Sequence, residues 1–220
     1  MTPVLPYRNR SEAGRLLAAE LGRYKSGRDV LVLGLARGGL PVASEVASFL
    51  DAPLDVLVVR KLGAPIQPEL AIGAIAADGT RVLNEEIIRD LAISADSIDL
   101  ITQREQAEVE RRERAYRSGR PPLDLKDHIV ILVDDGLATG STMLAAVRFA
   151  RQRSPKKVVL AVPVGSIQAL EMLRAEVDEC VCLATPEWFN AVGEWYRDFP
   201  QVTDAEVKTL LDRSCHIHTS

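Results

Sequence analysis

Runs of apolar, β-branched residues that alternate with helical patterns constrain the fold of this chain more than any other feature. The runs VLVLGLA, LDVLVV and HIVILV begin at residues 30, 54 and 128, and each is apolar at nearly every position. Strands that are apolar on both faces are typical of a parallel sheet with helices on both sides. The sequence therefore predicts a doubly wound α/β fold, with a mainly parallel five-stranded sheet and flanking helices.

The expected elements follow from the same patterns. Strands are predicted at residues 30–35, 54–59, 70–76, 129–134, 157–163 and 179–183. Helices are predicted at residues 11–24, 40–50, 85–91, 97–116, 141–153, 166–176 and 204–211. A length of 220 residues fits a single domain of residues 1–220. Within it, we expect residues 84–122 to form a helical insertion or lid and residues 184–220 to form a small C-terminal hood.

Composition argues against two classes of partner. No apolar run approaches the roughly 18 residues of a membrane span, and the N-terminal stretch lacks the apolar region of a signal peptide. We therefore expect a cytoplasmic protein without a membrane partner. The formal net charge of -4 provides no global basic field for a nucleic-acid backbone, so no nucleic-acid partner is expected.

Three cysteines, an odd number, suit a reducing compartment better than a disulfide framework. Cys180 and Cys182 alternate along a predicted strand, so both thiols should lie on one face and fill the core. The tail carries Cys215, His216 and His218, which are metal-ligand types. A fourth ligand is not apparent, and a chain end offers few preorganised ligands, so no metal site is expected there.

The charged half of the predicted insertion, residues 104–117, is typical of an exposed helix. Opposite charges recur four residues apart at Glu108/Arg112, Glu110/Arg114 and Glu113/Arg117. A solvated helix explains this pattern, and a partner surface or a lid over the edge of the sheet are the alternatives.

Two adjacent carboxylates, Asp134 and Asp135, end the strand HIVILV. Burying such charges without a partner costs several kcal/mol, so a ligand is expected just outside the strand end, where parallel sheets bind ligands. The small-residue loop that follows opens a helix, and its backbone N–H groups form an anion cradle. The cradle comprises Ala138, Thr139, Gly140, Ser141 and Thr142. A phosphate on one side and sugar hydroxyls on the carboxylates describe a ribose 5-phosphate.

Two commoner phosphate motifs are absent from the sequence. The spacing of Gly136 and Gly140 differs from the nucleoside-triphosphate P-loop, and no Lys precedes Ser141. The stretch GLARGG at residues 34–39 is not G-x-G-x-x-G, so a dinucleotide site lacks its fingerprint.

The stretch VILVDDGLATGSTM resembles the signature of the type I phosphoribosyltransferases. The resemblance implies an Mg²⁺-dependent enzyme that transfers ribose 5-phosphate from phosphoribosyl pyrophosphate (PRPP) to a small nitrogen base and releases pyrophosphate. It implies that Asp134 and Asp135 hold the ribose hydroxyls and that Ala138 to Thr142 hold the 5-phosphate. It also implies that Mg²⁺ is held mainly through PRPP, with no separate protein metal site, and that the chain forms a homodimer.

The turn GLARGG resembles the pyrophosphate loop of that family, which often contains a non-proline cis peptide, here between Ala36 and Arg37. The resemblance assigns pyrophosphate to Ala36, Arg37, Gly38 and Gly39, and to Arg60 and Lys61, which precede a stretch similar to the family's mobile loop at 61–69. A glycine-rich turn with Arg37 in solvent, and a solvated Arg60–Lys61 pair, are the alternatives. The expected catalytic residues are Asp134, Asp135, Arg37 and Lys61.

The sequence says least about the site that binds the acceptor base. Pro186 to Phe189 resembles the P-D-x-F motif of hypoxanthine-type enzymes, which makes Phe189 the first and Trp188 the second candidate for stacking on the base. A C-terminal mini-core of aromatic residues is the alternative. Ala138 stands where hypoxanthine-type enzymes carry an Asp, so no general acid or base is identified. A PRPP-binding regulator without efficient transfer, or another sugar-phosphate activity, stays open because fold does not fix function.

Overall fold

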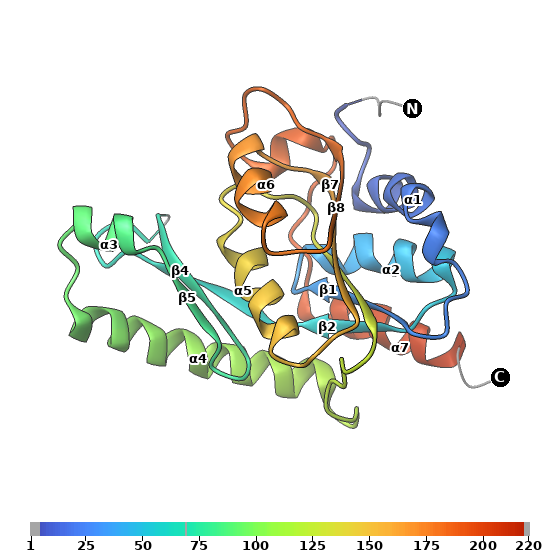
Figure 1. Cartoon of the computed structure of the whole chain (residues 1–220), viewed down its shortest axis with the longest axis horizontal. Helices are drawn as coiled ribbons and strands as arrows, with labels where there is room; N and C mark the ends of the chain where they lie inside the picture. Colours follow the sequence, from blue (N-terminus) through green and yellow to red (C-terminus); the bar gives the residue numbers. More distant parts are fainter. Residues whose placement is uncertain (1–4, 69, 218–220) are drawn as a thin grey trace.

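The structure is a computed structural model that describes residues 5–68 and 70–217, with side chains up to residue 214. Five parallel strands form the main sheet in the order β2-β1-β6-β7-β8 (Figure 1). They are β1 (Val30–Leu35), β2 (Leu54–Leu57), β6 (Ile129–Val133), β7 (Lys157–Val164) and β8 (Glu179–Ala184). This confirms the predicted five-stranded α/β sheet.

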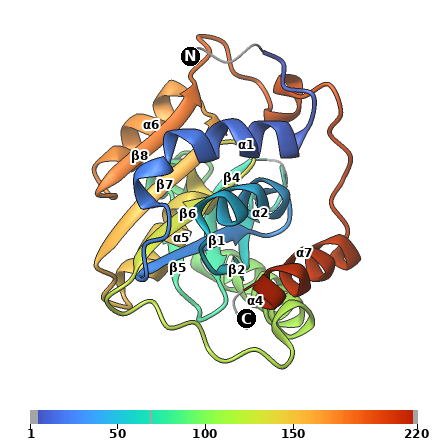
Figure 2. The ribbon, with the colours of Figure 1, turned by 90° about the vertical axis from the view of Figure 1, so that its right-hand side faces the viewer.

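Helices cover both faces of this sheet. One face packs against α1 (Arg10–Glu20), α2 (Gly39–Leu50) and α7 (Asp204–Ile217), and the turn of 3₁₀-helix Gly22–Tyr24 follows α1. Figure 2 shows α1 and α2 lying across this face. The other face packs against α5 (Ser141–Arg151) and α6 (Ile167–Arg174). A second 3₁₀ turn, Val192–Trp195, lies in the C-terminal segment.

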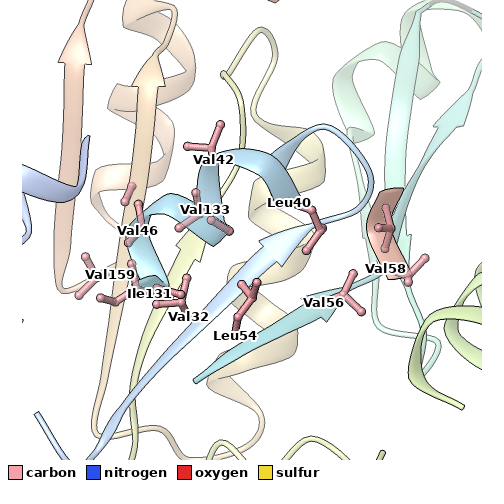
Figure 3. Close-up of a cluster of buried hydrophobic side chains, with 14 of the residues drawn as sticks. Val32, Leu40, Val42, Val46, Leu54, Val56, Val58, Ile131, Val133 and Val159 are labelled. Atoms are coloured by element: carbon pink, nitrogen blue, oxygen red, sulfur yellow. The ribbon is translucent and has the colours of Figure 1, made fainter. Parts of the chain in front are cut away.

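Alternate strand residues enter different cores, as the pleat requires. Val32, Ile131 and Val159 are fully buried under α1 and α2 (Figure 3), whereas Leu33 and Leu132 are buried under α5 and α6. Each such side chain contributes roughly 1.5–3 kcal/mol when it leaves water. Because a one-residue slip would exchange the two faces, this burial fixes the register that aligns the strand ends.

A second sheet of three antiparallel strands, in the order β3-β4-β5, was not predicted. It comprises β3 (Val59–Gly63), β4 (Ala71–Ala76) and β5 (Arg81–Leu83), and it precedes α3 (Glu85–Asp90) and α4 (Ala95–Arg117). The prediction of one strand over 54–59 was therefore wrong, because the chain leaves the main sheet after Leu57. The predicted strand 70–76 lies in the second sheet. Both α4 and α5 contact β4, which explains why every residue of this strand is buried.

The charged helix is α4, and only some of the ion pairs predicted from its sequence form. Glu108 and Arg112 form an ion pair at 2.6 Å. The prediction for Arg117 was wrong, because this side chain pairs with Asp55 of β2 instead of Glu113. Arg117 is buried where the end of α4 meets the edge of the main sheet, next to the half-buried carboxylate of Asp55.

The last elements extend the predictions. Cys180 and Cys182 are half-buried and pack against the core, as expected. α7 continues to Ile217 instead of ending at Leu211. The side chains of Cys215, His216 and His218 lie outside the described residues. Among the helices that the structure describes, none combines the length and apolarity needed to cross a membrane.

Candidate active site

The two predicted junctions meet at the carboxyl edge of the main sheet. β1 and β6 are neighbours, and Gly34 lies opposite Val133 in their register. A Cβ atom on Gly38 would lie 2.2 Å from Oδ2 of Asp135, and one on Gly39 would lie 2.6 Å from the carbonyl oxygen of Val133. Only glycine permits this approach. The peptide between Ala36 and Arg37 is cis, as the family resemblance implied.

The adjacent carboxylates differ in their surroundings. Asp134 accepts a hydrogen bond from the backbone N–H of Asp135 at 2.9 Å. Oδ2 of Asp135 accepts one from Nε of Arg10 at 2.8 Å, and both of these side chains are buried. Burial, and then the neighbouring Asp135 charge, raise the pKa of Asp134 well above its usual value. Burial also raises the pKa of Asp135, while the Arg10 guanidinium opposes this shift.

Asp134 faces a cavity of about 540 Å³ between the main sheet, the second sheet and α4. Ala36 and Thr142 line it from the two junctions. Its charged lining residues are Asp134, Glu105, Arg60, Lys61, Arg104 and Arg112. Cations outnumber carboxylates, so the cavity is suited to a polyanion.

The loop after Asp135 leads directly into the N-terminus of α5. Gly140 precedes α5 in the left-handed conformation, with φ of 77°. Ala138 and Thr139 are exposed, and the Ala138 carbonyl accepts a hydrogen bond from the Ser166 hydroxyl at 2.7 Å. This anchors one end of the loop to α6, while the first N–H groups of α5 lack helical partners and can bind an anion.

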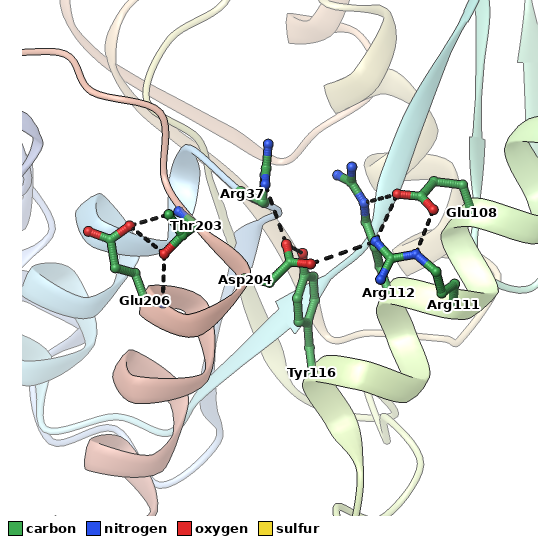
Figure 4. A network of polar contacts seen from close by, with 8 residues as sticks. All are labelled: Arg37, Glu108, Arg111, Arg112, Tyr116, Thr203, Asp204 and Glu206. Atoms are coloured by element: carbon green, nitrogen blue, oxygen red, sulfur yellow. Dashed lines mark hydrogen bonds and ion pairs between the residues drawn. The ribbon is translucent and has the colours of Figure 1, made fainter.

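The structure gives Arg37 a partner that sequence reasoning missed. Oδ1 of Asp204, in the first turn of α7, lies 3.4 Å from Nη1 of Arg37 and accepts a hydrogen bond from the Tyr116 hydroxyl at 2.6 Å (Figure 4). This bond, first among several interactions, lowers the pKa of Asp204. Arg111 of α4 lies 3.6 Å from the same carboxylate. No short stretch of sequence predicts this cluster, because its members come from three segments that are distant in the chain.

Arg60 and Lys61 both line the cavity that Asp134 faces, as their predicted role requires. Arg60 forms an ion pair with Glu105 of α4 at 2.7 Å, so it is not the solvated residue of the alternative interpretation. Lys61 is exposed. The following loop connects β3 to β4, and its residue 69 lies outside the described residues.

A second cavity, also of about 540 Å³, lies on the Asp135 side. Its lining includes Arg10, Arg37, Asp135, Val192, Phe199 and Pro200. Trp188 and Phe189 are not among its lining residues. Trp188 is 80% exposed. The Phe189 ring lies 6.0 Å from that of Trp195, within the predicted aromatic mini-core.

Sequence reasoning missed Arg10 and Phe199, although both lie at this cavity. Arg10 follows the helix cap Asn9, and it reads locally as an ordinary residue in a first helical turn. Phe199 belongs to the aromatic segment, but nothing in its spacing separates it from Phe189. Tyr196 contacts both Asp135 and Phe199. Its hydroxyl donates to the Asp135 carbonyl at 2.6 Å, and its ring stacks on that of Phe199 with the ring centres 4.9 Å apart.

Comparison with known proteins matches residues 5–199 to the phosphoribosyl transferase domain. A Mycobacterium tuberculosis protein named "Putative phosphoribosyl transferase Rv0571c" is 50% identical over 206 residues, which cover 94% of this chain and 46% of that protein. The chain thus spans about half the length of this relative. TT1426 from Thermus thermophilus is 42% identical with a TM-score of 0.78, over 94% of this chain and 98% of that one. A Bifidobacterium longum uracil phosphoribosyltransferase is 28% identical over 67% of this chain and 68% of its own length.

Proposed function

The chain belongs to the phosphoribosyl transferase family, and from this premise we propose that it transfers ribose 5-phosphate from PRPP to a nitrogen atom of a small base. The observation that carries the proposal is the position of Asp134 and the cradle residue Thr142 on one basic cavity. A sugar needs the carboxylate, a phosphate needs the cradle, and a diphosphate needs the excess of cations. PRPP combines all three groups.

In the proposed orientation, PRPP lies along the carboxyl edge of the main sheet. The 5-phosphate binds the N–H groups of residues 138–142, and the ribose hydroxyls donate to Asp134 and Asp135. The pyrophosphate then extends toward the turn 36–39 and Lys61, in the basic cavity. Gly38 and Gly39 let this turn lie directly against the two carboxylates, so that sugar and leaving group share one edge of the sheet.

The donor set fits Mg²⁺ that arrives with the substrate. Asp134 and Asp135 provide carboxylate oxygens, which Mg²⁺ prefers together with phosphate oxygens and water. Among the described residues, no three metal-ligating side chains gather. When bound, Mg²⁺ neutralises charge on the departing pyrophosphate.

The residues of the chain act by position and charge. The Asp134 and Asp135 carboxylates place negative charge beside the cationic ribose that develops as the C1–oxygen bond breaks. Arg37 and Lys61 stabilise the pyrophosphate. α4 forms a wall of the cavity and limits the access of water, which competes with the acceptor. The nitrogen base occupies the cavity on the Asp135 side, where Val192, Phe199 and Val202 provide apolar contacts in place of Phe189 and Trp188.

The experiment that tests the proposal measures pyrophosphate release from PRPP and Mg²⁺ with purines, pyrimidines and other nitrogen heterocycles. We expect release that depends on one class of base and is lost when Asp134 and Asp135 are both replaced by Asn. Calorimetric titration with PRPP runs in parallel. Tight binding without release for any base would support a PRPP sensor, and no binding would refute the proposal.

A further inference from the structure

The segment before α1 pairs with the segment that precedes α7, beside the second cavity. Tyr7 forms a parallel bridge with Tyr196, and its backbone N–H donates to the Trp195 carbonyl at 2.9 Å. The Arg197 N–H returns a bond to the Tyr7 carbonyl at 2.8 Å. Since α1 begins three residues after Tyr7, this pairing places Arg10 directly under the segment 199–201.

Arg10 is held there by three contacts. Nε donates to Asp135 and Nη1 donates to the Pro200 carbonyl, each at 2.8 Å. Its Cζ atom lies 3.7 Å from the centre of the Phe199 ring. The residue is only 8% exposed. Among the described residues, Nη2 has no hydrogen-bond partner. The guanidinium is thus fixed in orientation with one donor edge unused.

Two arginines and one carboxylate line this cavity, and Arg37 also pairs with Asp204, which lies outside the lining. Arg10 and Arg37 line it, and Asp135 is the one carboxylate among its lining residues. The Asp135 charge is shared between Arg10 and the ribose that the proposed function assigns to it. A bound neutral base could offer Nη2 only a carbonyl oxygen or a ring nitrogen, and a hydrogen bond to such a neutral acceptor contributes less than one to a charged group. A carboxylate would give Nη2 a charge-assisted hydrogen bond.

Apart from Gly38 and the polar residue Gln201, the rest of the lining is apolar. Val192, Phe199, Pro200 and Val202 contribute flat or branched surfaces without charge. Such surfaces suit the faces of a planar ring. The cavity therefore combines an apolar slot with a cationic end, beside the carboxylate that faces the sugar.

We infer that the acceptor is a planar nitrogen heterocycle that carries a carboxylate, and that Arg10 binds this carboxylate. The inference rests on the proposed function and names its substrate class. In the transfer, the lone pair of the ring nitrogen forms a bond to C1 of the ribose. The C1–oxygen bond breaks, and its electron pair leaves with pyrophosphate. A proton on that nitrogen, where the heterocycle carries one, passes to solvent.

The test uses matched acceptors that differ only in the acidic group. Uracil is compared with its 6-carboxylate, and pyridine-3-carboxamide with pyridine-3-carboxylate, by pyrophosphate release from PRPP and Mg²⁺. We expect kcat/KM for the acid of at least one pair to exceed that of its neutral partner by about 10- to 100-fold, as charge-assisted hydrogen bonds give. A neutral partner that reacts as well as its acid in both pairs would overturn the inference while leaving the proposed function standing.

Variants of Arg10 separate recognition from a structural role. Arg10→Gln should reduce the acid-to-neutral ratio about 10-fold or more, and Arg10→Lys should retain part of it because the charge remains. If Arg10 only neutralises Asp135, the glutamine variant lowers PRPP affinity and both rates equally, and the unchanged ratio refutes the inference. If PRPP binds but no acceptor reacts, the affinity of the protein for each acid and its neutral partner is measured by calorimetry in the presence of Mg²⁺ and pyrophosphate. Equal affinities within both pairs would then overturn the inference. Absence of PRPP binding instead refutes the proposed function.

Discussion

Nη1 of Arg37 lies 3.4 Å from Oδ1 of Asp204, although the two residues are 167 positions apart in the chain. Arg37 is the side chain assigned to pyrophosphate, so Asp204 competes with the ligand for its charge. Asp204→Asn should therefore increase the affinity for Mg²⁺-pyrophosphate by about 3-fold, because partly exposed ion pairs contribute up to about 1 kcal/mol. Calorimetric titration measures this change.

Glu206→Gln is the matched control for this prediction. Glu206 lies in the same helical turn as Asp204, but it accepts hydrogen bonds from Thr203 and none from Arg37. Its replacement removes the same charge from the start of α7 and should leave pyrophosphate affinity unchanged. Weaker binding by the Asp204 variant alone would contradict the competition and make Asp204 a positioning residue for Arg37.

Asp134 should make the ligand-free protein less stable as pH rises. Burial raises its pKa above the value of about 3.9 in an unfolded chain. The stability that this group contributes is therefore fully present below about pH 4 and is lost as pH rises through the folded pKa. Asp134→Asn cannot ionise, so its melting temperature should match wild type near pH 4 and exceed it by roughly 2–4 °C at neutral pH. Thermal unfolding across this pH range checks the prediction.

The neighbouring carboxylate provides an internal contrast. Asp135→Asn removes the anionic partner of the buried Arg10 and should lower the melting temperature at neutral pH, since an unpaired buried charge is costly. Stabilisation by both substitutions would show that the Arg10 contact does not offset the cost of burying Asp135.

Tyr196→Phe should cost about 1–2 kcal/mol of unfolding free energy. The Tyr196 hydroxyl donates to the Asp135 carbonyl at 2.6 Å inside the protein, and its loss leaves that carbonyl without this donor. Tyr7→Phe is a matched control, because its hydroxyl also donates to a buried carbonyl, that of Pro163 at 2.8 Å. Denaturant unfolding should show similar losses for both variants. PRPP titration should show weaker binding only for Tyr196→Phe. Equal PRPP affinities of the two variants would show that the Tyr196 hydroxyl does not position the Asp135 loop for binding.

The parts of the fold that local pattern encodes could be predicted. Strand β6, the carboxylate pair at its end and Gly140 at the start of α5 form one continuous stretch. Its apolar run, its charges and its small residues each have a local physical reason. The turn at Ala36 to Gly39 was predicted for the same reason, because one strand end determines its position.

Pairings between distant segments could not be predicted in this way. The predicted strand over 54–59 is continuous in apolarity, so periodicity gives no sign that Leu57 ends one sheet and Val59 begins another. Arg10 and Phe199 meet through the bridge between Tyr7 and Tyr196, which no short window of sequence contains. The cavity on the Asp135 side is built by such pairings, and this is why the sequence pattern favours Phe189 over Phe199.

Arg112 of α4 should contribute to pyrophosphate binding, although it lies outside both junction motifs. Its side chain is 13% exposed, its Nε is held by Glu108 at 2.6 Å, and it lines the cavity with Asp134 and Thr142. Arg112→Gln should weaken Mg²⁺-PRPP binding about 10-fold, which corresponds to about 1.4 kcal/mol. The control is Arg111→Gln, because Arg111 also pairs with Glu108, at 2.7 Å, but is exposed and absent from that lining. Calorimetry at two salt concentrations separates the outcomes. An equal loss of Mg²⁺-PRPP affinity in both variants that vanishes at high salt would reduce the role of α4 to long-range attraction. A loss of affinity that is confined to Arg112→Gln and persists at high salt establishes direct contact.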